Sequence, residues 1–160
     1  MDDARELFVF AAGNQLFAVP ANEVAGTAER TVPAKLPLAP PTVLGVICVR
    51  GRMLTVLNAT ALVNPSQSET PAVLPLVVVL RGDEQLALGA DRQHDPLQVR
   101  SSEIRPIPPI EETATRPGKP LAESAILGSV LRDNRNIVIL NPRKLFAAAM
   151  GKSERRRRRT

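Results

Sequence analysis

The stretch LGVICVRGRMLTVLN, residues 44–58, decides how the rest of the chain is interpreted. Two apolar runs rich in Val, Leu and Ile flank the triplet Arg50-Gly51-Arg52, which is the pattern of two short strands joined by a turn. Asn58 follows, and asparagine often opens a helix because its side chain accepts from free backbone N–H groups. The stretch therefore predicts a β-hairpin with two arginines at its tip, followed by a short helical turn.

The same pattern occurs again 83 residues further along the chain. LGSVLRDNRNIVILNPRKLF, which starts at Leu127, aligns without a gap with LGVICVRGRMLTVLNATALV, which starts at Leu44. A second pair of similar segments, residues 7–19 and 76–88, contains turn signals at Gly13-Asn14 and Gly82-Asp83 and predicts two further hairpins. The chain thus reads as two copies of one plan.

We expect a tail over residues 1–6, a first repeat over 7–63, a linker over 64–75 and a second repeat over 76–146, all within one domain spanning 7–150. Pro142 and the helix formers after it predict a C-terminal helix over about 142–150. Each copy holds about five short strands, and a small sheet leaves costly free edges unless it closes on itself. An all-β fold of two small barrels packed together follows.

The net charge of +5 lies entirely in the last ten residues, GKSERRRRRT. Residues 1–150 contain equal numbers of basic and acidic side chains, so the expected fold is neutral. Because like charges repel, we expect residues 151–160 to be a disordered tail. Arg155, Arg156, Arg157, Arg158 and Arg159 could bind nucleic acid or an anionic membrane through counterion release, or could only keep the chain soluble.

Candidate chemistry is sparse. The single histidine, His94, lies near Asp91 and Asp95, which makes a general-base pair conceivable, but a surface loop histidine is the simpler interpretation. Glu111 and Glu112 follow a proline-rich stretch that does not fix the geometry that a metal or glycosidase site needs. Phosphate-binding and zinc-protease motifs are absent, and so are Trp and Tyr. The sequence predicts no enzyme, no cofactor and no metal.

The single cysteine, Cys48, excludes an internal disulfide or a zinc cluster of cysteines. It lies in an apolar run, so we interpret it as a small buried hydrophobic residue; a redox role beside Arg50 is the alternative. The acidic start MDDARE does not match a signal peptide, and no uncharged apolar stretch is long enough to span a bilayer. We expect a cytoplasmic protein.

With these residues assembled, the chain resembles the CheW-type coupling proteins of bacterial chemosensory systems. The resemblance covers residues 7 to about 146. It is carried by FVFAAGNQLFAVPANEVAG, by VLGVICVRGRMLTVLNATALV, and by SSEIRPIPPI with ILGSVLRDNRNIVILNPRKLF. The second of these is similar to the family's signature, G-V-x-N-L-R-G followed by an apolar strand.

The resemblance implies a fold of two intertwined five-stranded SH3-like β-barrels with short helices. It also implies a non-enzymatic signalling adaptor that couples the cytoplasmic tip of a chemoreceptor to the regulatory domain of a histidine kinase, in arrays that contain other CheW-like proteins. By position in the motif, the receptor-binding residues would be Val24, Gly45, Arg50 and Gly51. The kinase-binding residues would be Arg105 and Ile110.

The chain departs from the family pattern at several positions. Cys48 stands where the signature has Asn, Thr55 where a proline is usual and Asn58 where an aspartate is usual. Because the signature amide is lost, the resemblance does not indicate which receptor the chain binds. The arginine-rich tail is not a usual feature of the family. A divergent adaptor that binds receptor without kinase, or a binder of nucleic acid or membrane through the tail, are the alternative functions.

Overall fold

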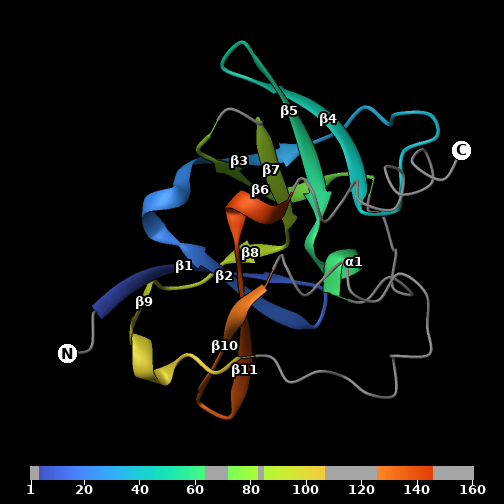
Figure 1. The fold of residues 1–160 in the computed structure, drawn as a ribbon. Coiled ribbons are helices and arrows are strands. Elements are labelled where there is room, and N and C mark those ends of the chain that lie inside the picture. The colour runs from blue at the N-terminus through green and yellow to red at the C-terminus, as the bar shows by residue number, and fades with distance from the viewer. Residues whose placement is uncertain (1–3, 64–71, 83–84, 107–125, 146–160) are drawn as a thin grey trace, which may run out of the picture.

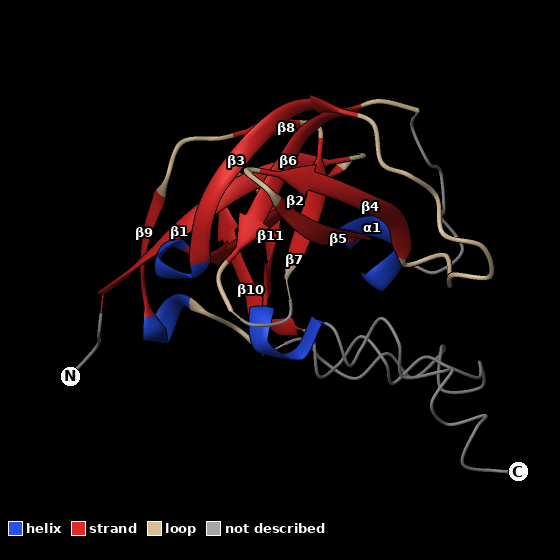
Figure 2. Ribbon diagram, turned by 90° about the horizontal axis from the view of Figure 1, so that it is seen from above, coloured by secondary structure: helices blue, strands red, loops and turns tan. Residues whose placement is uncertain are grey.

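The computed structural model describes residues 4–63, 72–82, 85–106 and 126–145. These residues form eleven strands, one α-helix and three 3₁₀-helices, so the expectation of an all-β fold is confirmed. Figure 2 shows that strands make up nearly all of the body and that the helices are short. In chain order the elements are β1 (Ala4–Ala12), β2 (Gln15–Pro20), η1 (Ala21–Glu23), β3 (Val24–Thr31), β4 (Val43–Val49), β5 (Arg52–Asn58), α1 (Ala59–Val63), β6 (Leu74–Leu80), β7 (Leu86–Ala90), β8 (Arg92–Gln93), β9 (Leu97–Arg100), η2 (Ser101–Glu103), β10 (Ile126–Arg132), β11 (Arg135–Leu140) and η4 (Pro142–Lys144).

The two sheets exchange hairpins between the repeats. One sheet has the order β3-β6-β7-β5-β4, and the other has β10-β11-β2-β1-β8, with β9 also paired to β1. The first hairpin of each repeat therefore lies in the sheet that holds the second hairpin of the other repeat (Figure 1). The joints are parallel pairs, β2 with β11 and β5 with β7. The intertwined arrangement that the resemblance implied is confirmed.

Each sheet is closed by one short backbone bridge. Ala34, just after β3, exchanges two hydrogen bonds with Val46 of β4, with N···O distances of 2.8 and 2.9 Å. Arg105, just after η2, does the same with Ser129 of β10, at 2.8 Å in both directions. Val46 and Ser129 are equivalent in the 83-residue repeat. The closure covers backbone groups that a free edge would expose, and it makes each sheet a small barrel.

Alternation along the strands divides the core into three clusters. Successive side chains of a strand point to opposite faces, so Leu7 and Val9 of β1 fill one barrel while Phe10 points to the space between the sheets. The other barrel has its own cluster around Leu54 and Val77. The third cluster lies between the two sheets and joins them. In it, Phe10 and Phe17 stack with ring centroids 5.8 Å apart. The members of this joining cluster with the lowest exposure include Phe10, Phe17, Val19, Leu57, Val78, Leu88, Leu140 and Leu145.

The repeat is also visible in backbone details. Gly45 in β4 and Gly128 in β10 have φ values of 149° and 156°, and both lie at register shifts of their hairpins. The turns of these hairpins have positive φ at both central residues, Arg50-Gly51 in one and Asp133-Asn134 in the other. Two-residue hairpin loops with two positive φ values follow the twist of the strands that they join.

Asparagine opens a helical turn after both hairpins, as expected. Asn58 is buried and its side chain accepts from the backbone N–H of Ala61 at 3.2 Å. The side chain of Asn141 accepts from the N–H of Arg143 at 3.2 Å, and Pro142 occupies the first helical position. The expected C-terminal helix starts here as a 3₁₀ turn, and its later part lies outside the described residues.

The expected boundaries differ in detail from the strands. β1 begins at Ala4, within the segment expected as a tail, because Ala4, Arg5 and Glu6 pair with β9. β6 begins at Leu74, within the expected linker. The arginine-rich tail over residues 151–160 lies outside the described residues.

Candidate functional site

The hairpin of β4 and β5 carries the most distinctive surface feature. Its tip projects from the body at the top of Figure 1. Arg50, Gly51 and Arg52 are all exposed there. The tip thus presents two guanidinium groups, whose several directed donors suit the carbonyl and carboxylate acceptors of a protein partner.

The backbone of Arg50 has an uncommon conformation for its residue type. Its φ is 52°, in the left-handed region, where a side chain with a Cβ costs about 1 kcal/mol. Asparagine and glycine are the usual residues at this position of a two-residue hairpin loop, and the equivalent loop has Asp133-Asn134. Strained residues of this kind cluster at functional sites. Among the described residues, Arg50 is one of six non-glycine residues with positive φ, and it combines this backbone with exposure at the tip of a projecting hairpin.

Gly45 has a different environment from the tip. It is buried, and a Cβ built on it would lie 2.6 Å from the carbonyl oxygen of Ala34. The missing side chain lets Ala34 approach β4 and close the barrel. Gly45 therefore faces Pro33 and Ala34 of the same chain and not the surface. Its role is to support the hairpin that holds Arg50.

Val24, the expected apolar contact, starts β3 and is half-buried against the cluster that joins the two sheets. β3 and β4 are the two ends of one sheet, and the Ala34–Val46 bridge brings the chain after β3 alongside β4. Three of the expected receptor-side residues, Gly45, Arg50 and Gly51, therefore share one hairpin, and Val24 lies in the same barrel.

Of the two expected kinase-side residues, Arg105 belongs to the other barrel. Arg105 is exposed, and its backbone forms the bridge to Ser129. Ile110 lies outside the described residues. Arg50 lies in the β4–β5 turn and Arg105 is bridged to β10, so the two residues belong to different barrels, and Figure 1 shows the β4–β5 tip and β10 at opposite ends of the molecule.

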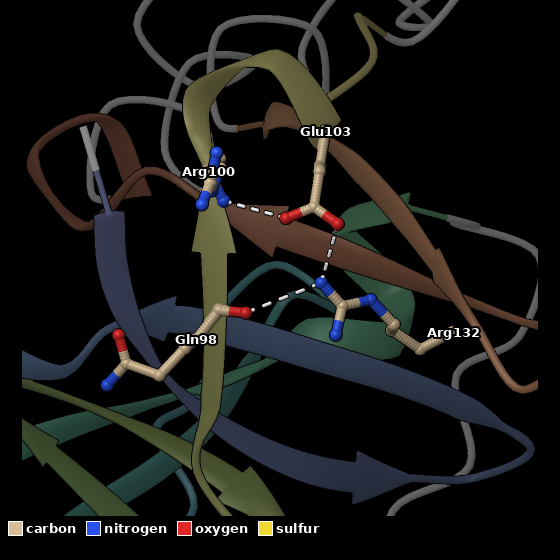
Figure 3. A network of polar contacts seen from close by, with 4 residues as sticks. All are labelled: Gln98, Arg100, Glu103 and Arg132. Atoms are coloured by element: carbon tan, nitrogen blue, oxygen red, sulfur yellow. Dashed lines mark hydrogen bonds and ion pairs between the residues drawn. The ribbon is translucent and has the colours of Figure 1, made fainter. Parts of the chain in front are cut away.

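A polar network surrounds the segment that leads to Arg105, and sequence reasoning missed it (Figure 3). Glu103 pairs with Arg132 of β10 at 2.7 Å, and Arg132 also donates to the carbonyl oxygen of Gln98 at 3.3 Å. The other carboxylate oxygen of Glu103 accepts from the backbone N–H of Arg100 at 2.8 Å. The backbone hydrogen bond from Arg100 is the main reason that the pKa of Glu103 lies below its usual value. Desolvation opposes this shift, and the hydrogen bond and charge of Arg132 add to it. The carboxylate is therefore charged at neutral pH.

Cys48 is exposed, so its interpretation as a buried residue was wrong. Ile47 takes the inward position of this part of β4, and alternation then turns Cys48 outward, opposite Met53 of β5, which is 59% exposed. An apolar run in a hairpin that projects from the body does not have to be buried on both faces.

The other candidates for chemistry, His94 and Asp91, form hydrogen bonds within the fold. His94 lies half-buried between β8 and β9, and its backbone N–H donates to the carbonyl oxygen of Val9. The Asp91 carboxylate accepts from the backbone N–H of Gly13 at 2.8 Å and so fastens the turn of the first hairpin. Over the described ranges there is no group of His, Cys, Asp and Glu residues that could hold a metal ion. In the same part of the chain, no helix is long and apolar enough to cross a membrane.

Comparisons with known proteins agree with this architecture. The family model described as CheW-like domain matches residues 6–150. The chain is 33% identical over 107 residues to "Chemotaxis protein CheW" of Rhizobium meliloti (strain 1021), an alignment that covers 66% of this chain and 68% of that protein. Its fold is similar to that of the scaffolding protein TtCheW from Thermoanaerobacter tengcongensis, with a TM-score of 0.69 at 17% identity, covering 87% of this chain and 85% of that one.

Proposed function

Because the chain belongs to the family of CheW-like domain proteins, we propose that it is a non-enzymatic adaptor of a bacterial chemosensory system. In this proposal it couples the cytoplasmic tip of a methyl-accepting chemoreceptor to the regulatory domain of a CheA-type histidine kinase. It acts in the cytoplasm, next to receptor arrays that contain further CheW-like proteins.

The observation that supports the proposal best is the conformation of Arg50. An exposed arginine occupies a left-handed turn position that asparagine or glycine would occupy at lower cost. Since the turn itself gains nothing from a guanidinium, the exposed Arg50 side chain is available for a contact outside the chain. A helical hairpin with acceptor groups on its surface is such a partner, and the family context points to the receptor tip.

The receptor contact divides between polar and apolar residues. Arg50 donates to carbonyl or carboxylate oxygens of the receptor, and Gly51 keeps the turn free of a side chain that would hold the partner away. Val24 packs against an apolar face of the receptor helix. Gly45 contributes indirectly, because it shapes the hairpin that carries Arg50.

The kinase contact lies on the other barrel. Arg105 is exposed beside the closing bridge, and Ile110 follows five residues later in the chain. In this proposal, one barrel binds the receptor at the β4–β5 tip and the other barrel binds the kinase at the Arg105 segment. Both proteins could then bind at once.

Replacement of Arg50 by asparagine tests this assignment. We expect Arg50→Asn to raise the free energy of unfolding by about 0.5–1 kcal/mol, because asparagine tolerates the left-handed turn better. We expect the same change to weaken binding of a purified receptor tip by roughly tenfold, the usual scale for truncation of an arginine at the centre of an interface. Chemical denaturation and a binding titration measure the two effects.

Asp133→Asn is the matched control, since Asp133 occupies the equivalent turn position of the second hairpin. It should leave receptor binding unchanged. If Arg50→Asn binds the receptor tip as tightly as the unaltered chain does, the assignment of Arg50 is wrong.

A further inference from the structure

The segment that carries Arg105 has a second attachment besides its backbone bridge. Glu103 lies two residues before Arg105, and Arg132 lies three residues after Ser129. The ion pair of 2.7 Å and the bridge at Arg105 and Ser129 therefore join the same two stretches of chain, side by side. Through the Arg100 N–H and the Gln98 carbonyl, the pair also connects to β9 (Figure 3).

The other barrel shows that this ion pair is not needed to close a barrel. Its bridge, between Ala34 and Val46, occupies the equivalent place in the repeat. The residue equivalent to Arg132 is Val49, which packs against the apolar cluster of that barrel. Both bridges have a glycine beside them, Gly45 and Gly128, that admits the neighbouring backbone. Both barrels are thus closed by the same kind of backbone bridge, and the barrel that contains β10 has the ion pair as well.

The addition occurs in the barrel that has Arg105 at its bridge. Arg105 is exposed, and its two backbone hydrogen bonds with Ser129 hold its main chain but not its side chain. A single bridge permits the flanking residues to rotate, and Glu103 restricts the segment on the side that leads into Arg105. Because its pKa is lowered, chiefly by the Arg100 N–H, the carboxylate keeps its charge through weakly acidic pH and loses the pair only as pH falls through that lowered value.

We infer that Glu103 and Arg132 are positioning residues for Arg105, and that their ion pair sets the affinity of this barrel for the kinase regulatory domain. The inference rests on the proposed function, which makes Arg105 a contact for the kinase. It assigns to Glu103 and Arg132 no contact of their own with the partner. They act by holding the Ile104–Arg105 segment against β10.

A double-mutant cycle tests the inference. The ion pair is partly exposed, so Glu103→Gln should weaken binding of the kinase regulatory domain by about two- to fivefold. In an Arg105→Ala background, Glu103→Gln should cause no further loss, because the residue acts through Arg105. Binding of the receptor tip should not change in any of these variants.

Two further measurements keep the outcome readable. Glu6→Gln removes a carboxylate from β1, next to β9, with the same change of net charge, and should leave kinase binding unaltered. Hydrogen exchange should show the amides of Arg105 and Ser129 exchanging about two- to fivefold faster in Glu103→Gln, since the pair stabilises the bridge locally.

The possible results separate the two proposals. If the unaltered chain does not bind the kinase domain, the kinase half of the proposed function fails, and amide exchange still decides whether the pair holds Arg105. If kinase binding is present but the losses from Glu103→Gln and Arg105→Ala add, Glu103 acts independently of Arg105 and the inference is overturned. Unchanged exchange at Arg105 and Ser129 would overturn it as well.

Discussion

Gly45→Ala should lower the free energy of unfolding by about 3 kcal/mol, the combined scale of backbone strain and overpacking at one buried position. The new Cβ would lie 2.6 Å from the Ala34 carbonyl oxygen and 2.9 Å from Cβ of Pro33. The first of these neighbours is backbone and takes part in the bridge to Val46, so it cannot move without loss of the closure. The φ of 149° is also unfavourable for alanine. Urea denaturation measures the loss.

Gly26→Ala is the control, because Gly26 lies in β3 of the same barrel and a Cβ there meets nothing within 4 Å. We expect a change within about 0.5 kcal/mol, as for other substitutions without a steric conflict. Gly128→Ala should resemble Gly45→Ala, since its Cβ would lie 2.7 Å from the carbonyl oxygen of Arg105. Equal stability of the Gly45 and Gly26 variants would show that the close approach does not support the barrel.

Arg50→Glu should weaken binding of the receptor tip by at least about 30-fold, which corresponds to the loss of a hot-spot residue. The change removes the donors and places a carboxylate opposite the acceptors that the arginine would bind. The fold should persist, because residue 50 is exposed at a hairpin tip. Circular dichroism checks the fold, and a titration with the purified receptor tip measures the affinity.

The matched control for this variant is Arg135→Glu. Arg135 is exposed beside the turn of the second hairpin, so the variant reverses the same charge at the tip that the proposal does not use. A loss confined to Arg50→Glu identifies a local contact. Equal losses in both variants would mean that the receptor responds to net charge alone, and the specific role of Arg50 would be refuted.

Local patterns in the sequence were enough to predict the hairpins. Alternating apolar residues around Gly13, around Gly82 and around the Arg50-Gly51 turn defined the strands, and the gapless alignment at 83 residues defined the repeat. The asparagine caps followed from the same reasoning, because a cap depends only on residues three or four positions away.

The pairing between repeats could not be derived from such patterns. β2 lies beside β11, and Gln15 donates to the carbonyl oxygen of Asn136, 121 residues away in the sequence. The alternation of apolar residues along a strand indicates which face of the strand is buried, but it does not indicate which other strand pairs with it. The exchange of hairpins was expected only from the resemblance to a family.

Side chains at the surface were also beyond prediction from composition. Cys48 looked like a core residue because its neighbours are apolar, and its exposure depends on how far the hairpin projects from the body. Arg132, the ion-pair partner of Glu103, lies 29 residues away, and Gly13, the partner of Asp91, lies 78 residues away. The glutamate three residues after Arg100 was the one local signal of the η2 cap.

The claim that one chain joins two partners through two separate barrels is tested most directly by sedimentation of the three purified components together. The proposal predicts one complex that contains the receptor tip, this chain and the kinase regulatory domain, and predicts that Arg50→Glu removes the receptor while the kinase domain stays bound. If receptor and kinase domain instead displace each other from the chain, the two-barrel account is contradicted. If only the receptor binds, the chain is an adaptor that does not couple to this kinase.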